Sequence, residues 1–117
     1  MGMMAITVNG AEPSSVFPPF ILGSSAIASG DDVIIFVTPG GAPALVKGVM
    51  EKMEVKGLPD LMELLEGFQL LGGRIMLCEL AFEVKGLTED DIREGVEIVG
   101  ATTFINEAKN ANLTFSF

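Results

Sequence analysis

The chain has no histidine, a single cysteine and few basic residues, and each shortage excludes a class of function. Without histidine, Ser-His-Asp and Cys-His catalytic sets are impossible, and one cysteine leaves too few ligands for a zinc site, so we expect no metal. Lysine and arginine total 7 against 16 acidic residues, and the net charge of -9 removes the attraction to a phosphate backbone. We therefore expect no nucleic-acid partner, and any proton transfer would depend on carboxylates, lysines, the thiol or water.

The single cysteine, Cys78, cannot form a disulfide within the chain, which fits a reducing compartment and makes the cytoplasm the expected location. The first basic residue is Lys47, so the apolar stretch FPPFILGSSAIASG lacks the charged leader of a signal peptide. Its prolines, glycines and serines also make it unsuited to span a bilayer, so we expect no membrane association.

The length of 117 residues suits one compact domain covering residues 1–117. Hydrophobic residues make up 49% of the chain and the mean hydropathy is +0.50, which is high for a small monomer with a large surface-to-volume ratio. We therefore expect part of the apolar surface to be buried against other copies in a homo-oligomer.

Apolar runs alternate with helical patterns along the chain, which predicts a mostly parallel α/β sheet of about five strands. The run from Val33 to Val37 is apolar throughout and is expected to be a central strand covered on both faces. Leu113, Phe115 and Phe117 alternate with polar residues, which indicates a last strand with one wet face. The predicted strands are MMAITV (3–8), DDVIIFV (31–37), RIMLCEL (74–80), VEIVGA (96–101) and NLTFSF (112–117).

Helices are predicted between these strands. In the first connection, Pro18 and Pro19 should delay the helix until after them. Leucine, methionine and phenylalanine at three- and four-residue spacings predict a core-facing helix in LPDLMELLEGFQLLGG, and Leu64 and Leu71 widen its apolar stripe as contact with another subunit would require. Thr88 and Asp91 form the ends of a capping box that should open a helix in LTEDDIREGV. Further helices are expected in GGAPALVKGVMEKM (40–53) and TTFINEAKNA (102–111).

Cys78 is the candidate reactive residue because it lies near the carboxyl end of a predicted strand, where ligands and reactive groups gather in open α/β sheets. Pro39, Gly40 and Gly41 follow another strand, so we expect them to share this edge with Cys78 and with the neighbouring Glu79. A free cysteine is also among the most frequently buried residue types. A core role and a reactive role are both open at this point.

The glycines in TPGGAPALVKG follow a strand and precede a predicted helix, as in nucleotide-binding loops. The segment has neither G-x-G-x-x-G nor the G-K-[ST] ending of a phosphate-binding loop. We interpret Gly40 and Gly41 as residues of a tight strand-to-helix turn, with an anion site on their backbone as the alternative, and expect no cofactor.

The segment RIMLCELAFEVKGLTEDDIREGVEIVGATTFINEAKNANLTFSF, residues 74–117, resembles the DsrE/DsrF-like family of small sulfur-relay proteins. The resemblance lies in a strand running into a cysteine, a short segment to Gly-Leu, an acidic helix start, GVEIVGA, a helix and a final strand. It implies a three-layer flavodoxin-like sandwich, assembly into oligomers, and a cysteine that carries sulfur as a persulfide. The only position that matches the sulfur-carrying cysteine is Cys78.

From this resemblance we expect a sulfur carrier or sulfurtransferase that exchanges sulfur with donor and acceptor proteins through Cys78. One alternative is a noncatalytic oligomeric binding or assembly module with Cys78 in its core, because some family members are noncatalytic subunits. A second alternative is a one-cysteine peroxidase recycled by an external thiol. A two-cysteine peroxidase cycle is disfavoured because the chain has no second cysteine.

Overall fold

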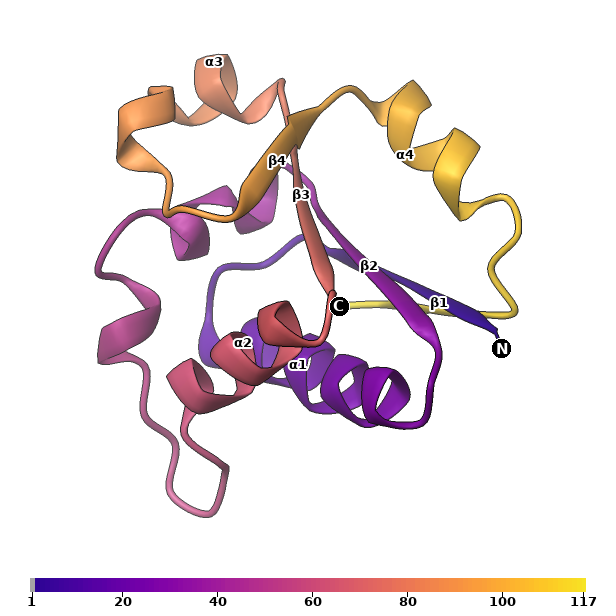
Figure 1. The fold of residues 1–117 in the computed structure, drawn as a ribbon. Coiled ribbons are helices and arrows are strands. Elements are labelled where there is room, and N and C mark those ends of the chain that lie inside the picture. The colour runs from indigo at the N-terminus through magenta and orange to yellow at the C-terminus, as the bar shows by residue number, and fades with distance from the viewer. Residues whose placement is uncertain (1) are drawn as a thin grey trace.

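The computed structural model describes residues 2–117 and shows five parallel strands in one sheet with helices on both faces (Figure 1). This confirms the predicted α/β sandwich. The strands are β1 (Met3–Val8), β2 (Asp32–Val37), β3 (Arg74–Cys78), β4 (Val96–Val99) and β5 (Leu113–Ser116). The helices are α1 (Pro13–Ala28), α2 (Leu61–Leu70), α3 (Ala81–Lys85) and α4 (Ala101–Ala108).

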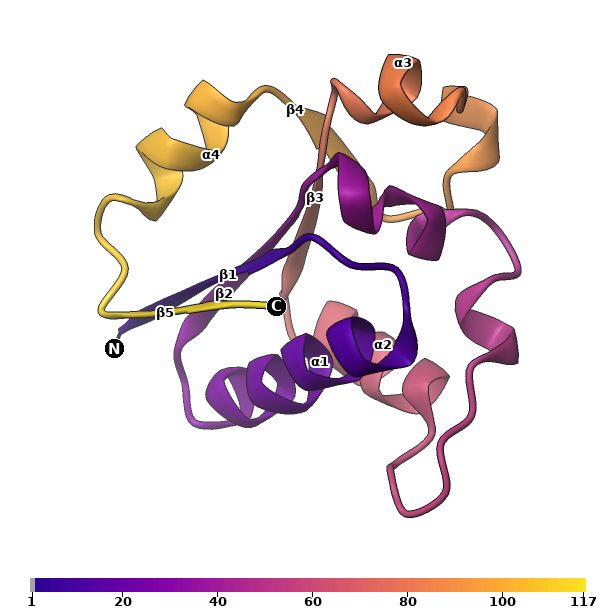
Figure 2. The same ribbon diagram turned by 180° about the vertical axis from the view of Figure 1, so that it is seen from behind.

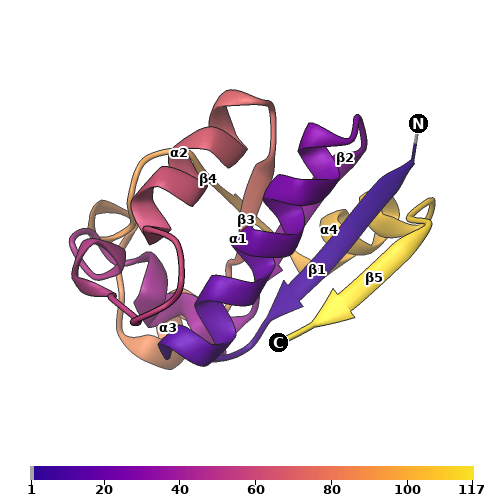
Figure 3. The ribbon, with the colours of Figure 1, turned by 90° about the horizontal axis from the view of Figure 1, so that it is seen from below.

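The strand order, β4-β3-β2-β1-β5, decides which face each helix covers. The chain adds β2, β3 and β4 successively in one direction, and right-handed crossovers place the intervening helices on one face. The return from β4 to β5 runs the opposite way, so α4 alone lies on the second face. Figures 2 and 3 show α1 and α2 on one side of the sheet and α4 on the other. The second face is therefore thinly covered.

The period of two along each strand divides the core into two apolar clusters. The face under α1 and α2 buries Ile6, Ile35 and Ile75 from the three inner strands together with Phe17 and Phe68 from the helices. The second cluster is smaller and comprises Ala5, Ile34, Phe36, Met76, Cys78 and Phe104. The central position of β2 between β1 and β3 confirms the prediction from its unbroken apolar run.

The predicted start of α1 after the prolines is wrong, because the helix begins at Pro13 and passes through Pro18 and Pro19. Pro13 occupies the first turn, where a missing N–H costs nothing. The two internal prolines remove two helical hydrogen bonds, and burial of Phe17 and Phe20 at 1% and 4% exposure holds the segment helical nevertheless. None of the helices in residues 2–117 is long and apolar enough to cross a membrane.

Two other predictions of helices are wrong, because the structure has only 3-10 turns in those segments. Residues 40–53 contain 3-10 turns at Pro39–Leu45 and Met50–Lys52 rather than an α-helix. Pro43 lacks the N–H for a helical bond, and Gly48 adopts a left-handed φ of 85° that ends any continuation. The capping box of Thr88 and Asp91 forms as predicted, but it caps a single 3-10 turn before the chain enters β4.

Helix α2 follows its predicted stripe over a shorter length. Leu61, Leu65 and Phe68 are buried, and the Asp60 carboxylate caps the helix by accepting a hydrogen bond from the Met62 N–H at 3.0 Å. Leu58 lies before this cap and is 42% exposed. The core-facing part of the prediction is confirmed for the residues inside the helix.

Candidate functional site

Cys78 is the last residue of β3, and its side chain points to the face that α4 covers. It pairs with Val99 of β4 on one side, while on the other the pairing of Leu77 with Val37 places it beside the end of β2. The residue is only 4% exposed and lies in the smaller apolar cluster. The single thiol of the chain therefore lies at the carboxyl edge of the sheet but is buried.

The predicted rim residues gather at this same edge. Pro39, Gly40 and Gly41 begin the 3-10 segment that directly follows β2, and this segment contacts both β3 and α3. Glu79 follows Cys78 and donates its backbone N–H to the Val99 carbonyl at 2.9 Å. The carboxylate of Glu79 lies over Gly100, where an added Cβ atom would come within 3.3 Å of it.

The two glycines of the rim are packed against the end of β1. A Cβ atom on Gly40 would lie 2.2 Å from the backbone oxygen of Asn9, and one on Gly41 would lie 2.9 Å from that of Val8. Neither glycine has a positive φ. The close approach of the β1 backbone, and not an unusual backbone conformation, therefore explains why glycine occupies both positions. Their role as residues of a tight, closely packed turn is the one expected from the sequence.

Helix α4 covers the thiol-bearing face with a single fully inserted side chain. Phe104 is its only buried residue and stacks on Phe36, with ring centroids 4.4 Å apart and an interplanar angle of 7°. The next residue, Ile105, is 55% exposed. The helix is therefore attached to the apolar surface around Cys78 chiefly by one aromatic stack.

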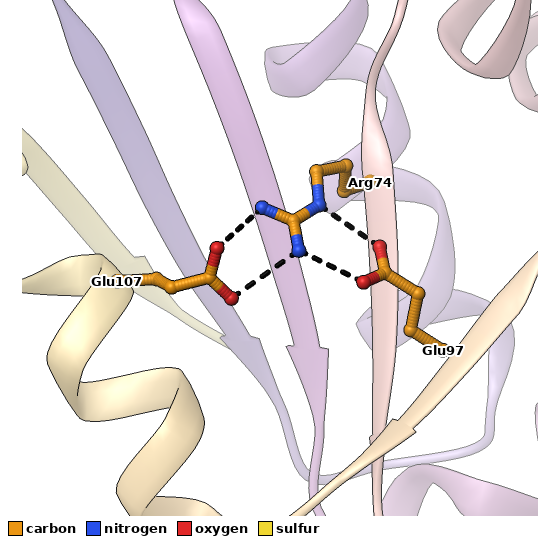
Figure 4. A network of polar contacts seen from close by, with 3 residues as sticks. All are labelled: Arg74, Glu97 and Glu107. Atoms are coloured by element: carbon orange, nitrogen blue, oxygen red, sulfur yellow. Dashed lines mark hydrogen bonds and ion pairs between the residues drawn. The ribbon is translucent and has the colours of Figure 1, made fainter.

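A second attachment of α4, not predicted from the sequence, is an arginine between two glutamates (Figure 4). Arg74 donates from Nε and Nη2 to Glu97 of β4 at 2.9 and 2.8 Å, and from Nη1 and Nη2 to Glu107 of α4 at 2.6 and 3.2 Å. The forked guanidinium suits two bidentate carboxylates. A charged residue opening an otherwise apolar strand was the available signal, but its partners are distant in sequence.

The arginine clamp makes stability depend on pH. The hydrogen bonds from Arg74 lower the pKa of Glu97 below its usual value of 4.5, so the carboxylate contributes stability above that value and loses it as the pH falls through the lowered pKa. Both side chains are about two-fifths exposed, so we expect Glu97→Gln to cost only about 0.5 kcal/mol at pH 7.

Urea titrations of the wild type and Glu97→Gln from pH 7 to pH 3 measure this effect. The difference in unfolding free energy should shrink below pH 4.5. Glu83→Gln is the matched control, since no ion pair or side-chain hydrogen bond involves Glu83 within residues 2–117. A difference for Glu97→Gln that is constant over the whole pH range would contradict the clamp.

No group of three or more histidine, cysteine, aspartate or glutamate side chains in the described part of the chain is arranged to hold a metal ion. The groups at the carboxyl edge include the Cys78 thiol and the neighbouring Glu79 carboxylate. The Cys78 thiol is 4% exposed, and its thiolate is the form that would act as a nucleophile.

Comparison with solved structures supports the fold. The ychN protein of E. coli superposes with a TM-score of 0.79 at 20% identity, with all of both chains covered. MTH1491 of Methanobacterium thermoautotrophicum gives a TM-score of 0.74 at 14% identity and covers 98% of this chain and 97% of its own. At these identities the likeness concerns the fold alone.

Two curated proteins are similar in sequence. The uncharacterized protein MJ0760 of Methanocaldococcus jannaschii is 28% identical over 107 residues, which are 92% of this chain and 39% of MJ0760. YrkE of Bacillus subtilis is 26% identical over 74 residues, which are 63% of this chain and 44% of YrkE. The chain therefore spans less than half the length of either relative. Residues 39–115 match the family described as DsrE/DsrF/DrsH-like, and this chain belongs to that family.

Proposed function

We propose that this protein is a sulfur carrier or sulfurtransferase in sulfur relay, with Cys78 as the residue that holds the sulfur. The observation that carries the proposal is the position of the only cysteine, at the carboxyl end of β3 inside the family-matched region. The family supports a role related to sulfur relay, and this chain has one residue able to perform it. Cofactor and metal are not needed for the reaction.

The proposed chemistry is two successive thiol exchanges without net oxidation. The Cys78 thiolate attacks the outer sulfur of a donor persulfide, R–S–SH; a new S–S bond forms, the donor S–S bond breaks and R–S⁻ leaves. An acceptor thiolate then attacks the outer sulfur of Cys78–S–SH. The second S–S bond breaks in turn, and the Cys78 thiolate is regenerated.

The geometry adds one condition to this chemistry, which is that a sulfur donor must be able to reach the Cys78 sulfur atom. Cys78 is 4% exposed, so a donor reaches it only when α4 or the turn beside it opens. The light attachment of α4, one buried aromatic and one partly exposed clamp, makes local opening of this helix the least costly route. We therefore propose that α4 gates the thiol.

The same burial favours a second candidate function, a noncatalytic oligomeric module in which Cys78 only fills the core. In that case a thiol reagent would modify Cys78 at the rate of global unfolding. Sulfur carriage requires modification that is much faster than global unfolding, because α4 opens locally.

The intact mass of the native protein after incubation with a polysulfide or thiosulfate donor tests the proposal. We expect the gain of one sulfur atom, removed by an added thiol and absent from Cys78→Ser. Dilute peroxide should oxidise the thiol poorly under the same conditions. Rapid peroxide consumption without any sulfur adduct would replace the proposal with the one-cysteine peroxidase.

We further propose that the protein works in the cytoplasm as a homo-oligomer and docks with separate donor and acceptor proteins. The net charge of -9 would speed encounter with partners that present a basic patch. The related curated proteins are much longer than this chain. The docking role is therefore proposed for the present chain alone.

A further inference from the structure

The turn between β1 and α1 contains an asparagine followed by a glycine, Asn9 and Gly10, and its surroundings favour a reaction of this asparagine with the backbone. Asn9 is exposed, and the N–H of Gly10 has no backbone hydrogen-bond partner within residues 2–117. A free backbone nitrogen that follows an asparagine can attack the side-chain amide carbon and close a five-membered ring. Glycine permits this attack most easily, because it has no side chain to obstruct the approach.

The packing of the turn favours glycine at position 10. A Cβ atom there would lie 2.4 Å from the hydroxyl oxygen of Ser15 and 2.5 Å from Oε1 of Glu12. Gly10 does not have a positive φ, so close approach, and not backbone conformation, disfavours a side chain. The fold therefore favours, directly after Asn9, the residue that leaves the asparagine most reactive.

The same close approach places a carboxylate beside Gly10. Oε1 of Glu12 accepts a hydrogen bond from the Ser15 hydroxyl at 2.7 Å, which holds the carboxylate in this position. The hydrogen bond from Ser15 lowers the pKa of Glu12 below its usual value of 4.5, so the group is ionised at neutral pH. An ionised carboxylate beside an N–H can take up the proton as the nitrogen attacks.

The side-chain amide of Asn9 is also hydrogen-bonded to the end of β2. The Thr38 hydroxyl donates to Oδ1 of Asn9, and the contact of the same hydroxyl with the Val8 carbonyl is longer, at 3.2 Å. A donor on Oδ1 stabilises the negative charge that develops on this oxygen when the amide carbon is attacked. The turn thus brings a nucleophile, a base and a hydrogen-bond donor to one amide group.

We propose that Asn9 is a self-modification site, at which Glu12 and Thr38 promote its conversion to aspartate and isoaspartate. The Gly10 nitrogen forms a bond to Cγ of Asn9, the bond from Cγ to Nδ2 breaks, and ammonia leaves with the proton that Glu12 takes from Gly10. Water then opens the ring at one of its two carbonyl groups, which gives aspartate or isoaspartate. Water is the only co-reactant, and the reaction is separate from the sulfur chemistry proposed for Cys78.

The isoaspartate product would alter the carboxyl edge of the sheet. Its main chain runs through the former side-chain carbonyl and is longer by one methylene group. Asn9 donates its backbone N–H to the Phe117 carbonyl at 2.7 Å, and its backbone oxygen lies against Gly40. A longer main chain at this residue displaces that oxygen from the turn after β2, so the modification reaches the edge on which Cys78 lies.

Mass mapping of peptides from the full chain during incubation at pH 8 tests the proposal. Asn9 is the only asparagine in residues 1–47, which trypsin releases as one peptide, so replacement of an amide by an acid there assigns the reaction. We expect conversion at least about tenfold faster in the native protein than in the urea-unfolded chain, because only the folded turn holds the base and the donor in place. Asn110 and Asn112 precede alanine and leucine and should react far more slowly than Asn9.

Glu12→Gln is the test variant, because glutamine keeps an oxygen that can accept from Ser15 but removes the base. Its rate in the native state should fall at least about tenfold, and its rate in urea should equal that of the wild type. The matched control is Glu54→Gln, which removes an exposed carboxylate from another loop and should leave the rate unchanged. A native wild type that reacts no faster than the unfolded chain, or a Glu12→Gln variant as fast as the wild type, would overturn the proposal.

Discussion

Phe104→Ala is expected to destabilise the protein by about 3 kcal/mol and to expose Cys78 to thiol reagents. Phe104 is the only buried side chain of α4, and its ring stacks on Phe36 in the cluster that contains the thiol. If α4 opens locally, the lost stabilisation shifts the equilibrium between the closed and open helix towards the open form. Labelling of Cys78 in the native protein should then accelerate about a hundredfold. Urea unfolding measures the loss of stability, and the rate of reaction with a disulfide reagent that releases a coloured thiolate measures the exposure of Cys78.

Ile105→Ala is the control for this prediction, because it shortens the adjacent side chain, which is 55% exposed. Its stability should change by less than about 0.5 kcal/mol and its labelling rate should be that of the wild type. If Phe104→Ala is destabilised while Cys78 still reacts only at the rate of global unfolding, α4 is not the gate. That outcome would favour the noncatalytic module.

Gly40→Ala is expected to lower the free energy of unfolding by about 2 kcal/mol, because the structure has no space for the added methyl group. It would lie 2.2 Å from the backbone oxygen of Asn9 and 2.6 Å from its side-chain oxygen. Relief requires the ends of β1 and β2 to separate, and these strand ends form the carboxyl edge beside Cys78. Thermal unfolding followed by circular dichroism measures the loss.

The same substitution in an open helical position should have the opposite sign. Gly67 lies within α2 and an added Cβ there meets nothing within 4 Å. Gly67→Ala should therefore stabilise the protein by about 1 kcal/mol through helix propensity. A Gly40→Ala variant as stable as Gly67→Ala would show that the turn after β2 is not closely packed.

The strands were predictable from the sequence because each one is short, apolar and bounded by turn residues. The run from Val33 to Val37 is apolar at every position because β2 is central and both of its faces are buried. The alternation in residues 113–117 correctly indicates a strand with one wet face, on which polar Thr114 and Ser116 are exposed. Its apolar positions are less buried than expected, since Leu113 is 49% exposed.

The connections were harder to predict because tertiary packing overrides local preference in them. Pro18 and Pro19 indicated a late helix start, yet burial of the surrounding aromatic residues maintains α1 across both. In 40–53 an apolar pattern at helical spacing was interrupted by Pro43 and by Gly48, and the segment folded as separate 3-10 turns.

At the candidate site, the sequence predicted that Cys78 lies at the carboxyl edge of the sheet. It did not predict which elements cover the thiol. The cover provided by α4 depends on the chain crossing back over the sheet after β4, so that β5 pairs in parallel with β1, and this crossing has no local signature. The clamp of Arg74 joins residues 23 and 33 positions apart, so no short-range pattern reveals it. Both features bear on access to the thiol.

The most direct test of the central claim is to locate the sulfur on the chain. The native protein is loaded with a sulfane donor, the persulfide is trapped by alkylation, and the tryptic peptide that begins after Arg74 and ends at Lys85 is examined by mass spectrometry. We predict an alkylated persulfide on Cys78 in this peptide, formed far faster than global unfolding. An unmodified Cys78 with every donor, reactive only in the unfolded chain, would contradict the account.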